Sequence, residues 1–128
     1  MNTTLVQWIL RIAVAGEFIG HGLLAIGGKK DWISWTNQLT GMDMGTAGHF
    51  IFWVGVFDVF IAILVLVKPI RIALLWAAFW GFWTALVRPL VGVGWLDFVE
   101  RWANWGAPLA LLLLQGWPRS LKEWFSKE

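Results

Sequence analysis

The stretch that decides the fold runs from His49 to Val67 and reads HFIFWVGVFDVFIAILVLV. It holds 19 residues, and Asp58 is its only Asp, Glu, Lys or Arg. Because a helix rises about 1.5 Å per residue, this run matches a hydrocarbon core of ~30 Å. A water-exposed surface does not tolerate a helix that is apolar on all sides. The stretch therefore predicts a helix that crosses a membrane.

Working outward, three more segments are predicted to cross, namely residues 5–26, 70–88 and 97–117. Only Lys68 and Pro69 separate the second span from the third, so these two helices must be antiparallel neighbours. We expect an all-α, four-helix transmembrane bundle that forms a single domain over residues 1–128.

The fourth span is the least obvious of the four. The plain apolar run over residues 108–114 is too short to cross, so the span is extended back to Asp97. Asp97 and Glu100 have the spacing of a capping box. Pro108 then lies inside the helix and predicts a kink near residues 104–106.

The first loop is predicted to contain a short helix that lies in the membrane interface. Gly27 and Gly28 end the first span, and Asp31 is placed to cap the short helix. One face of this helix carries apolar side chains at helical spacing, namely Trp32, Trp35 and Leu39. Residues 118–128 predict an amphipathic tail resting on the membrane surface.

Charges near the span ends predict how the chain lies in the membrane. Basic residues are more numerous on the side that holds both termini, which places the termini in the cytoplasm. These residues are Lys68, Arg71, Arg119, Lys122 and Lys127, with Arg11 close by. A cleaved signal peptide ending near Ala15 is the alternative for the first segment, but Arg11 interrupts the apolar run and the run continues past Ala15.

The composition excludes several classes of function. The chain is 59% hydrophobic and 14% charged, against roughly 25% charged residues in a soluble domain. Ten basic and eight acidic residues are too evenly balanced for nucleic-acid binding, and the absence of Cys excludes disulfides and thiol chemistry. No nucleotide-binding loop, serine-nucleophile motif or zinc motif occurs. We therefore predict a binding or anchoring component rather than a complete enzyme.

Five ionisable residues inside the predicted spans form the candidate site. An ionised side chain at mid-membrane costs about 2.5–3.5 kcal/mol, so each one requires an explanation. Antiparallel packing brings Glu17 and Asp58 to one depth, and His21 lies one turn beyond Glu17. Arg11 reaches either Glu17 or the cytoplasmic surface, and Arg88 lies at the level of His21. We predict one polar cluster of Arg11, Glu17, His21, Asp58 and Arg88 facing the bundle interior.

Three interpretations of this cluster stay open. It is a structural ion-pair network, a substrate, quinone or proton site, or a set that includes residues lying at an interface. A metal site that adds His49 to Glu17 and His21 is disfavoured, because a single i, i+4 pair matches no metal motif.

Trp76, Trp80 and Trp83 share one face of the third span and form an aromatic stripe. The stripe is a candidate contact for a quinone or a lipid, although packing is the commoner use of such a pattern. On the first span, Gly16 and Gly20 form a small-xxx-small pair. We predict that this pair serves close packing within the bundle in preference to self-association.

Short motifs in two spans resemble a known family. The first span contains Leu10-Arg11 and then Phe18-Ile19-Gly20-His21-Gly22, and the second contains Gly55-Val56-Phe57-Asp58. These motifs resemble the DoxX/DoxD-like group of small four-helix bacterial membrane proteins, with Asp58 in place of that group's more usual Glu. The resemblance covers residues 10–67 and singles out Arg11, His21, Gly22 and Asp58. It implies a bacterial inner membrane protein associated with quinone-linked oxidoreductase systems.

The leading hypothesis is a membrane subunit or accessory component of a quinone-linked redox system, with quinone as the candidate cofactor. Its expected partners are the lipid bilayer, other redox-complex subunits and a second copy of the chain. Two alternatives use the same residues. One is a small proton-coupled transporter that depends on Glu17 and Asp58, and the other is a structural accessory subunit of a larger membrane complex.

Overall fold

The computed structural model describes residues 2–128, and every regular element in this range is a helix. The elements are α1 (Thr3–Ile26), α2 (Lys30–Thr40), α3 (Met44–Val67), α4 (Arg71–Leu90), α5 (Trp95–Val99), α6 (Ala103–Gln115) and α7 (Leu121–Trp124). Within residues 2–128, three helices are long and apolar enough to cross a membrane: α1, α3 and α4. The predicted all-α class and the first three spans are therefore confirmed as helices of membrane-spanning character.

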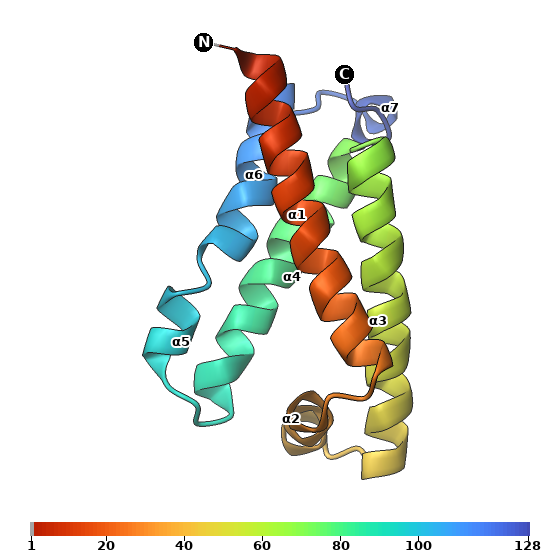
Figure 1. Ribbon diagram of the computed structural model, residues 1–128, viewed down its shortest axis with the longest axis vertical. Coiled ribbons are helices and arrows are strands. Elements are labelled where there is room, and N and C mark those ends of the chain that lie inside the picture. The colour runs from red at the N-terminus through yellow and green to blue at the C-terminus, as the bar shows by residue number, and fades with distance from the viewer. Residues whose placement is uncertain (1) are drawn as a thin grey trace.

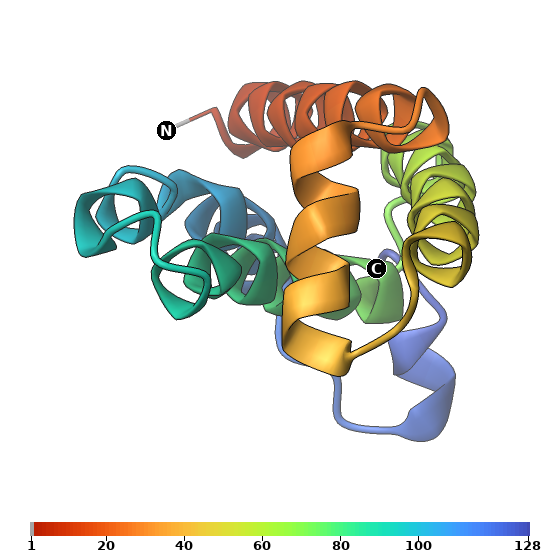
Figure 2. The ribbon, with the colours of Figure 1, turned by 90° about the horizontal axis from the view of Figure 1, so that it is seen from below.

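The helices form two antiparallel pairs, α1 with α3 and α4 with α6 (Figure 1). The helices α3 and α4 meet at their short connection and diverge from it, and both termini lie at this end of the molecule. At the opposite end, α2 lies across the bundle between α1, α3 and α4 (Figure 2). Buried apolar side chains of α1, α3, α4 and α6 join in one core, which includes Phe18, Leu74, Leu111 and Leu112.

Glycines lie at two close contacts between helices, but they are not the predicted pair. A Cβ atom on Gly55 of α3 would lie 2.6 Å from the carbonyl oxygen of Gly22 on α1. A Cβ atom on Gly81 of α4 would clash with the carbonyl oxygen of Asn104 on α6. Gly16 and Gly20 are exposed and have nothing within 4 Å of such an atom. The prediction that Gly16 and Gly20 pack inside the bundle is therefore wrong.

The fourth apolar segment is divided. The helix α6 has 13 residues, or about 20 Å of rise, which is shorter than a hydrocarbon core of ~30 Å. A turn over residues 100–102 separates it from α5, whereas the predicted break lay at residues 104–106. The turn falls where Arg101 pairs with Asp97 and Glu100, and such charges belong at a water interface.

Helix caps also differ from two predictions. Gly94 precedes α5, so Asp97 lies within the helix and no capping box forms. The residue before α2 is Lys29, and Asp31 lies in the first turn instead of capping it. The helix α3 begins at Met44 because Asp43 accepts hydrogen bonds from the backbone N–H and the hydroxyl of Thr46, at 2.8 and 2.9 Å.

Two arginines bind the carboxyl ends of neighbouring helices. Arg11 donates to the carbonyls of residues 65–67, the last turn of α3, and its guanidinium lies 3.8 Å from the centre of the Trp8 ring. Arg71 is buried and donates to the carbonyls of Gln115, Gly116, Glu123 and Ser126. Carbonyls at a helix end lack partners within the helix, so these cations stabilise the ends of α3 and α6.

Candidate functional site

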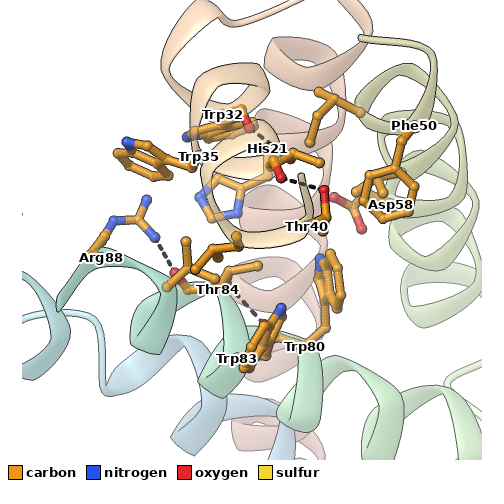
Figure 3. A pocket seen from close by; sticks show the side chains of 15 residues that line it. His21, Trp32, Trp35, Thr40, Phe50, Asp58, Trp80, Trp83, Thr84 and Arg88 are labelled. Carbon is orange, nitrogen blue, oxygen red and sulfur yellow. Dashed lines mark hydrogen bonds between the residues drawn. The ribbon is translucent and has the colours of Figure 1, made fainter. Parts of the chain in front are cut away.

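A cavity of about 240 Å³ lies at the α2 end of the molecule (Figure 3). Side chains from α1, α2, α3 and α4 line it, and most of them are apolar or aromatic. Three ionisable residues contribute to its walls, namely His21, Asp58 and Arg88. A mostly apolar cavity with a few convergent polar groups is the usual form of a small-molecule site.

The helix α2 covers this cavity. Glycines with positive φ, Gly28 before it and Gly41 after it, allow the chain to turn sharply at both ends. Trp32 and Trp35 point toward the cavity, and the ring of Trp32 meets His21 edge to face at 5.5 Å. The apolar face of the predicted interfacial helix is therefore used to close a cavity, because α1, α3 and α4 offer it a surface to pack on.

Asp58 is the most unusual group in the walls. The residue is 3% exposed, and its Oδ1 atom has no hydrogen-bond partner within residues 2–128. Burying a polar atom without a partner costs free energy. A bound molecule that donates a hydrogen bond to this oxygen would remove that cost.

Arg88 enters the cavity from α4, on the wall opposite Asp58 (Figure 3). It is 6% exposed, and one guanidinium nitrogen donates to its own helix at the carbonyl of Thr84, 2.5 Å away. The guanidinium also lies 5.3 Å from the centre of the Trp35 ring on the cover. Within residues 2–128, Arg101 forms the ion pairs, with Asp97 and Glu100. No carboxylate oxygen therefore lies within 4.0 Å of a guanidinium nitrogen of Arg88 in this part of the chain. Arg88 can therefore bind a hydrogen-bond acceptor or an anion.

The structure brings together only part of the predicted cluster. His21, Asp58 and Arg88 share the cavity, whereas Arg11 lies at the far end of α3 and does not reach Glu17. Glu17 does not line the cavity. The prediction failed for Arg11 because the carbonyls ending α3 provide it with nearer partners.

The aromatic stripe is also divided. Trp80 and Trp83 line the cavity, whereas Trp76 lies outside it and stacks on Trp80, with ring centres 5.5 Å apart and planes at 13°. His49 is exposed and does not line the cavity.

Four of the residues that line the cavity are exposed: Leu39 and Thr40 of α2, Phe50 of α3 and Trp83 of α4. Three of these four are apolar, so a molecule that enters past them would meet mostly apolar side chains.

Sequence reasoning missed the cover as part of the site. Trp32, Trp35, Thr36 and Thr40 line the cavity together with Thr84 of α4. The hydroxyls of Thr36, Thr40 and Thr84 already donate to carbonyls one turn back in their own helices. The signal that could have found the cover is the tryptophan face of residues 30–40, whose burial depends on where the helix folds back.

Comparison of the chain with protein-family models, curated proteins and solved structures finds no match in any of the three. The resemblance to the DoxX/DoxD-like group therefore stays a prediction that rests on the short motifs around His21 and Asp58.

Proposed function

We propose that this chain is an integral membrane protein that binds a small ring molecule of the quinone type in the cavity beneath α2. In this proposal it is a membrane component of a quinone-linked redox system and has no complete catalytic apparatus of its own. One observation carries the proposal: the unpartnered Asp58 oxygen and the carboxylate-free Arg88 guanidinium lie in opposite walls of one aromatic cavity.

The size and the chemistry of the cavity fit such a ring. An apolar cavity of about 150 Å³ accommodates benzene, and this cavity measures about 240 Å³. Arg88 would donate to one carbonyl oxygen of a quinone, and Asp58 would accept from the opposite hydroxyl of the reduced ring. The face of Trp80 or Trp83 offers a flat surface for stacking. When bound, such a ring supplies two-electron redox chemistry that the side chains of this chain lack.

We also propose that four segments cross the membrane, with α5 and α6 together forming the fourth. Residues 95–115 lie alongside α4, and both termini lie at one end of the molecule, which supports an even number of crossings. The excess of Lys and Arg at that end supports a cytoplasmic location for the termini in a bacterial inner membrane.

The first test is purification in a mild detergent, followed by solvent extraction and mass spectrometry of the molecules that accompany the protein. Recovery of a quinone or of a redox-complex subunit supports the proposal. A protein that carries only bulk phospholipid contradicts it.

The second test measures binding of a dimethoxy-methyl-benzoquinone and of its hydroquinone to purified protein by calorimetry. For the hydroquinone, Asp58→Asn is compared with Asp31→Asn, and for the quinone, Arg88→Gln is compared with Arg119→Gln, because Asp31 and Arg119 are exposed. Loss of one hydrogen bond to a charged group should weaken binding about tenfold or more in the cavity variants. Equal affinities for all four variants would remove this cavity as the site.

Proton-coupled transport is a second candidate, favoured by the buried Asp58 carboxyl group, whose Oδ1 atom has no partner, and by the lack of an ion pair to Asp58 or Glu17 within residues 2–128. It predicts pH-dependent flux in liposomes that is lost in Glu17→Gln and in Asp58→Asn. Flux that persists in both variants excludes this candidate.

A further inference from the structure

The direction of the Arg88 side chain depends on few contacts. Within residues 2–128 its guanidinium donates one hydrogen bond, to the carbonyl of Thr84 one turn back in the same helix. An arginine side chain has several rotatable bonds, so a single hydrogen bond to its own helix does not hold the guanidinium in one place. A second contact comes from the cover, because the guanidinium lies 5.3 Å from the centre of the Trp35 ring. Figure 3 shows Arg88 between Trp35 and Thr84.

The position of α2 brings Trp35 to this place. The helix lies across the end of the bundle (Figure 2), and Trp32 and Trp35 are three residues apart, so they share one of its faces. The Trp32 ring meets His21 of α1 edge to face at 5.5 Å. The Trp35 ring meets Arg88 of α4. The cover therefore places one aromatic ring against a polar side chain of each of two neighbouring helices.

A contact with an aromatic ring suits an arginine that binds a ligand. A cation near the face of a ring is attracted to it, and the attraction is larger where water is excluded. Arg88 is 6% exposed, so water is largely excluded from this contact. A carboxylate in the place of Trp35 would neutralise the guanidinium, whereas a ring leaves its charge in place. Arg88 is thereby held in the wall while its charge stays available to an oxygen atom in the cavity.

We infer that Trp35 is a positioning residue, which holds the Arg88 guanidinium where it donates to an oxygen atom of the ligand. This inference rests on the proposed function and adds a form of regulation to it, because the side chain that orients the binding arginine belongs to the cover. The site is complete only while α2 lies over the cavity. By thermodynamic linkage, an oxygen atom bound to Arg88 also stabilises α2 in this position.

The test is a double-mutant cycle on protein in lipid nanodiscs, with binding measured by calorimetry and empty nanodiscs as the blank. One ligand is a dimethoxy-methyl-benzoquinone, and the other is the dimethoxytoluene that has the same substituent pattern but neither carbonyl oxygen. Trp35→Leu should weaken quinone binding about fivefold more than dimethoxytoluene binding, as expected for the loss of a cation–π contact. In the Arg88→Gln background, Trp35→Leu should affect the two ligands equally.

Two further variants separate positioning from simple packing. Trp35→Phe keeps a ring facing Arg88 and should recover part of the affinity for the quinone. Trp32→Leu removes a ring of the same size from the same helix, and its effect on quinone binding should be the same in the wild-type and the Arg88→Gln backgrounds.

Three outcomes would overturn the inference while the proposed function stands. They are equal effects of Trp35→Leu on the two ligands in the wild-type background, an effect on the quinone that is unchanged by Arg88→Gln, and the same quinone affinity for Trp35→Phe as for Trp35→Leu. Failure of the quinone to bind wild type would instead overturn the proposed function, and the inference would fall with it.

A second measurement uses the wild-type chain and does not depend on how a variant folds. Backbone hydrogen exchange of residues 30–40 is measured by mass spectrometry without ligand, with saturating quinone and with saturating dimethoxytoluene. The quinone should slow exchange in α2 about fivefold more than dimethoxytoluene does, since the coupling between Arg88 and the cover is reciprocal. Equal exchange of α2 with the two ligands, under conditions where the quinone binds, would overturn the inference.

Discussion

Replacing Gly55 by Ala should destabilise this protein, whereas replacing Gly16 or Gly20 by Ala should not. A Cβ atom at Gly55 would lie 2.6 Å from the Gly22 carbonyl oxygen, 2.8 Å from the Ile26 nitrogen and 2.9 Å from the Ala25 Cβ atom. The first two are backbone atoms and the third is fixed to the backbone. No side-chain rotation relieves these contacts, so α1 must move away from α3.

The size of the effect follows from two opposing contributions. Overpacking costs about 1–3 kcal/mol, and replacing a helical glycine by alanine recovers up to about 1 kcal/mol. The result for Gly55→Ala is a net loss of about 1–2 kcal/mol, or roughly 4–8 °C in Tm. Gly22→Ala should be destabilising as well, since its Cβ atom would lie 2.7 Å from the Val59 Cγ2 atom and 2.9 Å from the Gly55 carbonyl oxygen.

Gly16→Ala and Gly20→Ala are the matched controls, because nothing lies within 4 Å of a Cβ atom at either position. Both variants should be as stable as wild type or up to about 1 kcal/mol more stable. The double variant of Gly22 and Gly55 should cost less than the sum of the two single changes, because one separation of α1 from α3 relieves both contacts.

The assay is thermal unfolding in mild detergent followed by circular dichroism, with size-exclusion chromatography to record any change of oligomeric state. Equal losses for Gly16→Ala and Gly55→Ala would refute the assignment of the close helix contact. A neutral Gly55→Ala would refute it as well.

Three further predictions test other contacts. Gly81→Ala should destabilise the protein at least as much as Gly55→Ala, because its Cβ atom would clash with the backbone of Asn104. Gly106→Ala should be tolerated, because nothing lies within 4 Å of a Cβ atom there. Thermal unfolding of the Gly81→Ala and Gly106→Ala variants tests both expectations. Arg71→Gln should lower the free energy of unfolding by about 2–4 kcal/mol, since buried Arg71 donates hydrogen bonds to four carbonyls. The same change should speed proteolysis of the tail after Gly116. Arg119→Gln, at an exposed position, should have neither effect. Hydrogen bonds from the backbone N–H and then the hydroxyl of Thr46 hold the pKa of Asp43 below its ordinary value, so its stabilising effect is complete above about pH 4 and is lost as the pH falls further. The difference in Tm between wild type and Asp43→Asn should therefore shrink below that pH, and a constant difference would contradict the assignment.

Much of the fold could be predicted from local pattern. The run from His49 to Val67, its neighbours on both sides and the glycines that end α1 each carry their signal in consecutive residues. The fourth segment was harder, since the charges of Asp97, Glu100 and Arg101 interrupt an apolar run that already contains Pro108. Its division into α5 and α6 depends on how residues 95–115 lie against α4.

The candidate site could be predicted only in part. Hydropathy identified His21, Asp58 and Arg88 as ionisable groups out of place in an apolar span, and the structure places them around one cavity. The same rule selected Arg11, whose long side chain reaches the end of α3 instead. Hydropathy gives the depth of a charge but not its partner, because the partner belongs to another helix.

The sequence by itself determined that the chain is helical, that three of its segments suit a membrane and that ionisable groups lie within them. Length and apolar content decide these properties, and both are counted along the chain. Only the tertiary structure decided that α2 closes a cavity, that Gly22 and Gly55 make the close contact while Gly16 and Gly20 face outward, and that Arg88 rather than Arg11 faces Asp58. The physical reason is that the crossing of α1, α3 and α4 sets which helix faces and which helix ends meet, and a crossing is fixed by the packing of all three helices together.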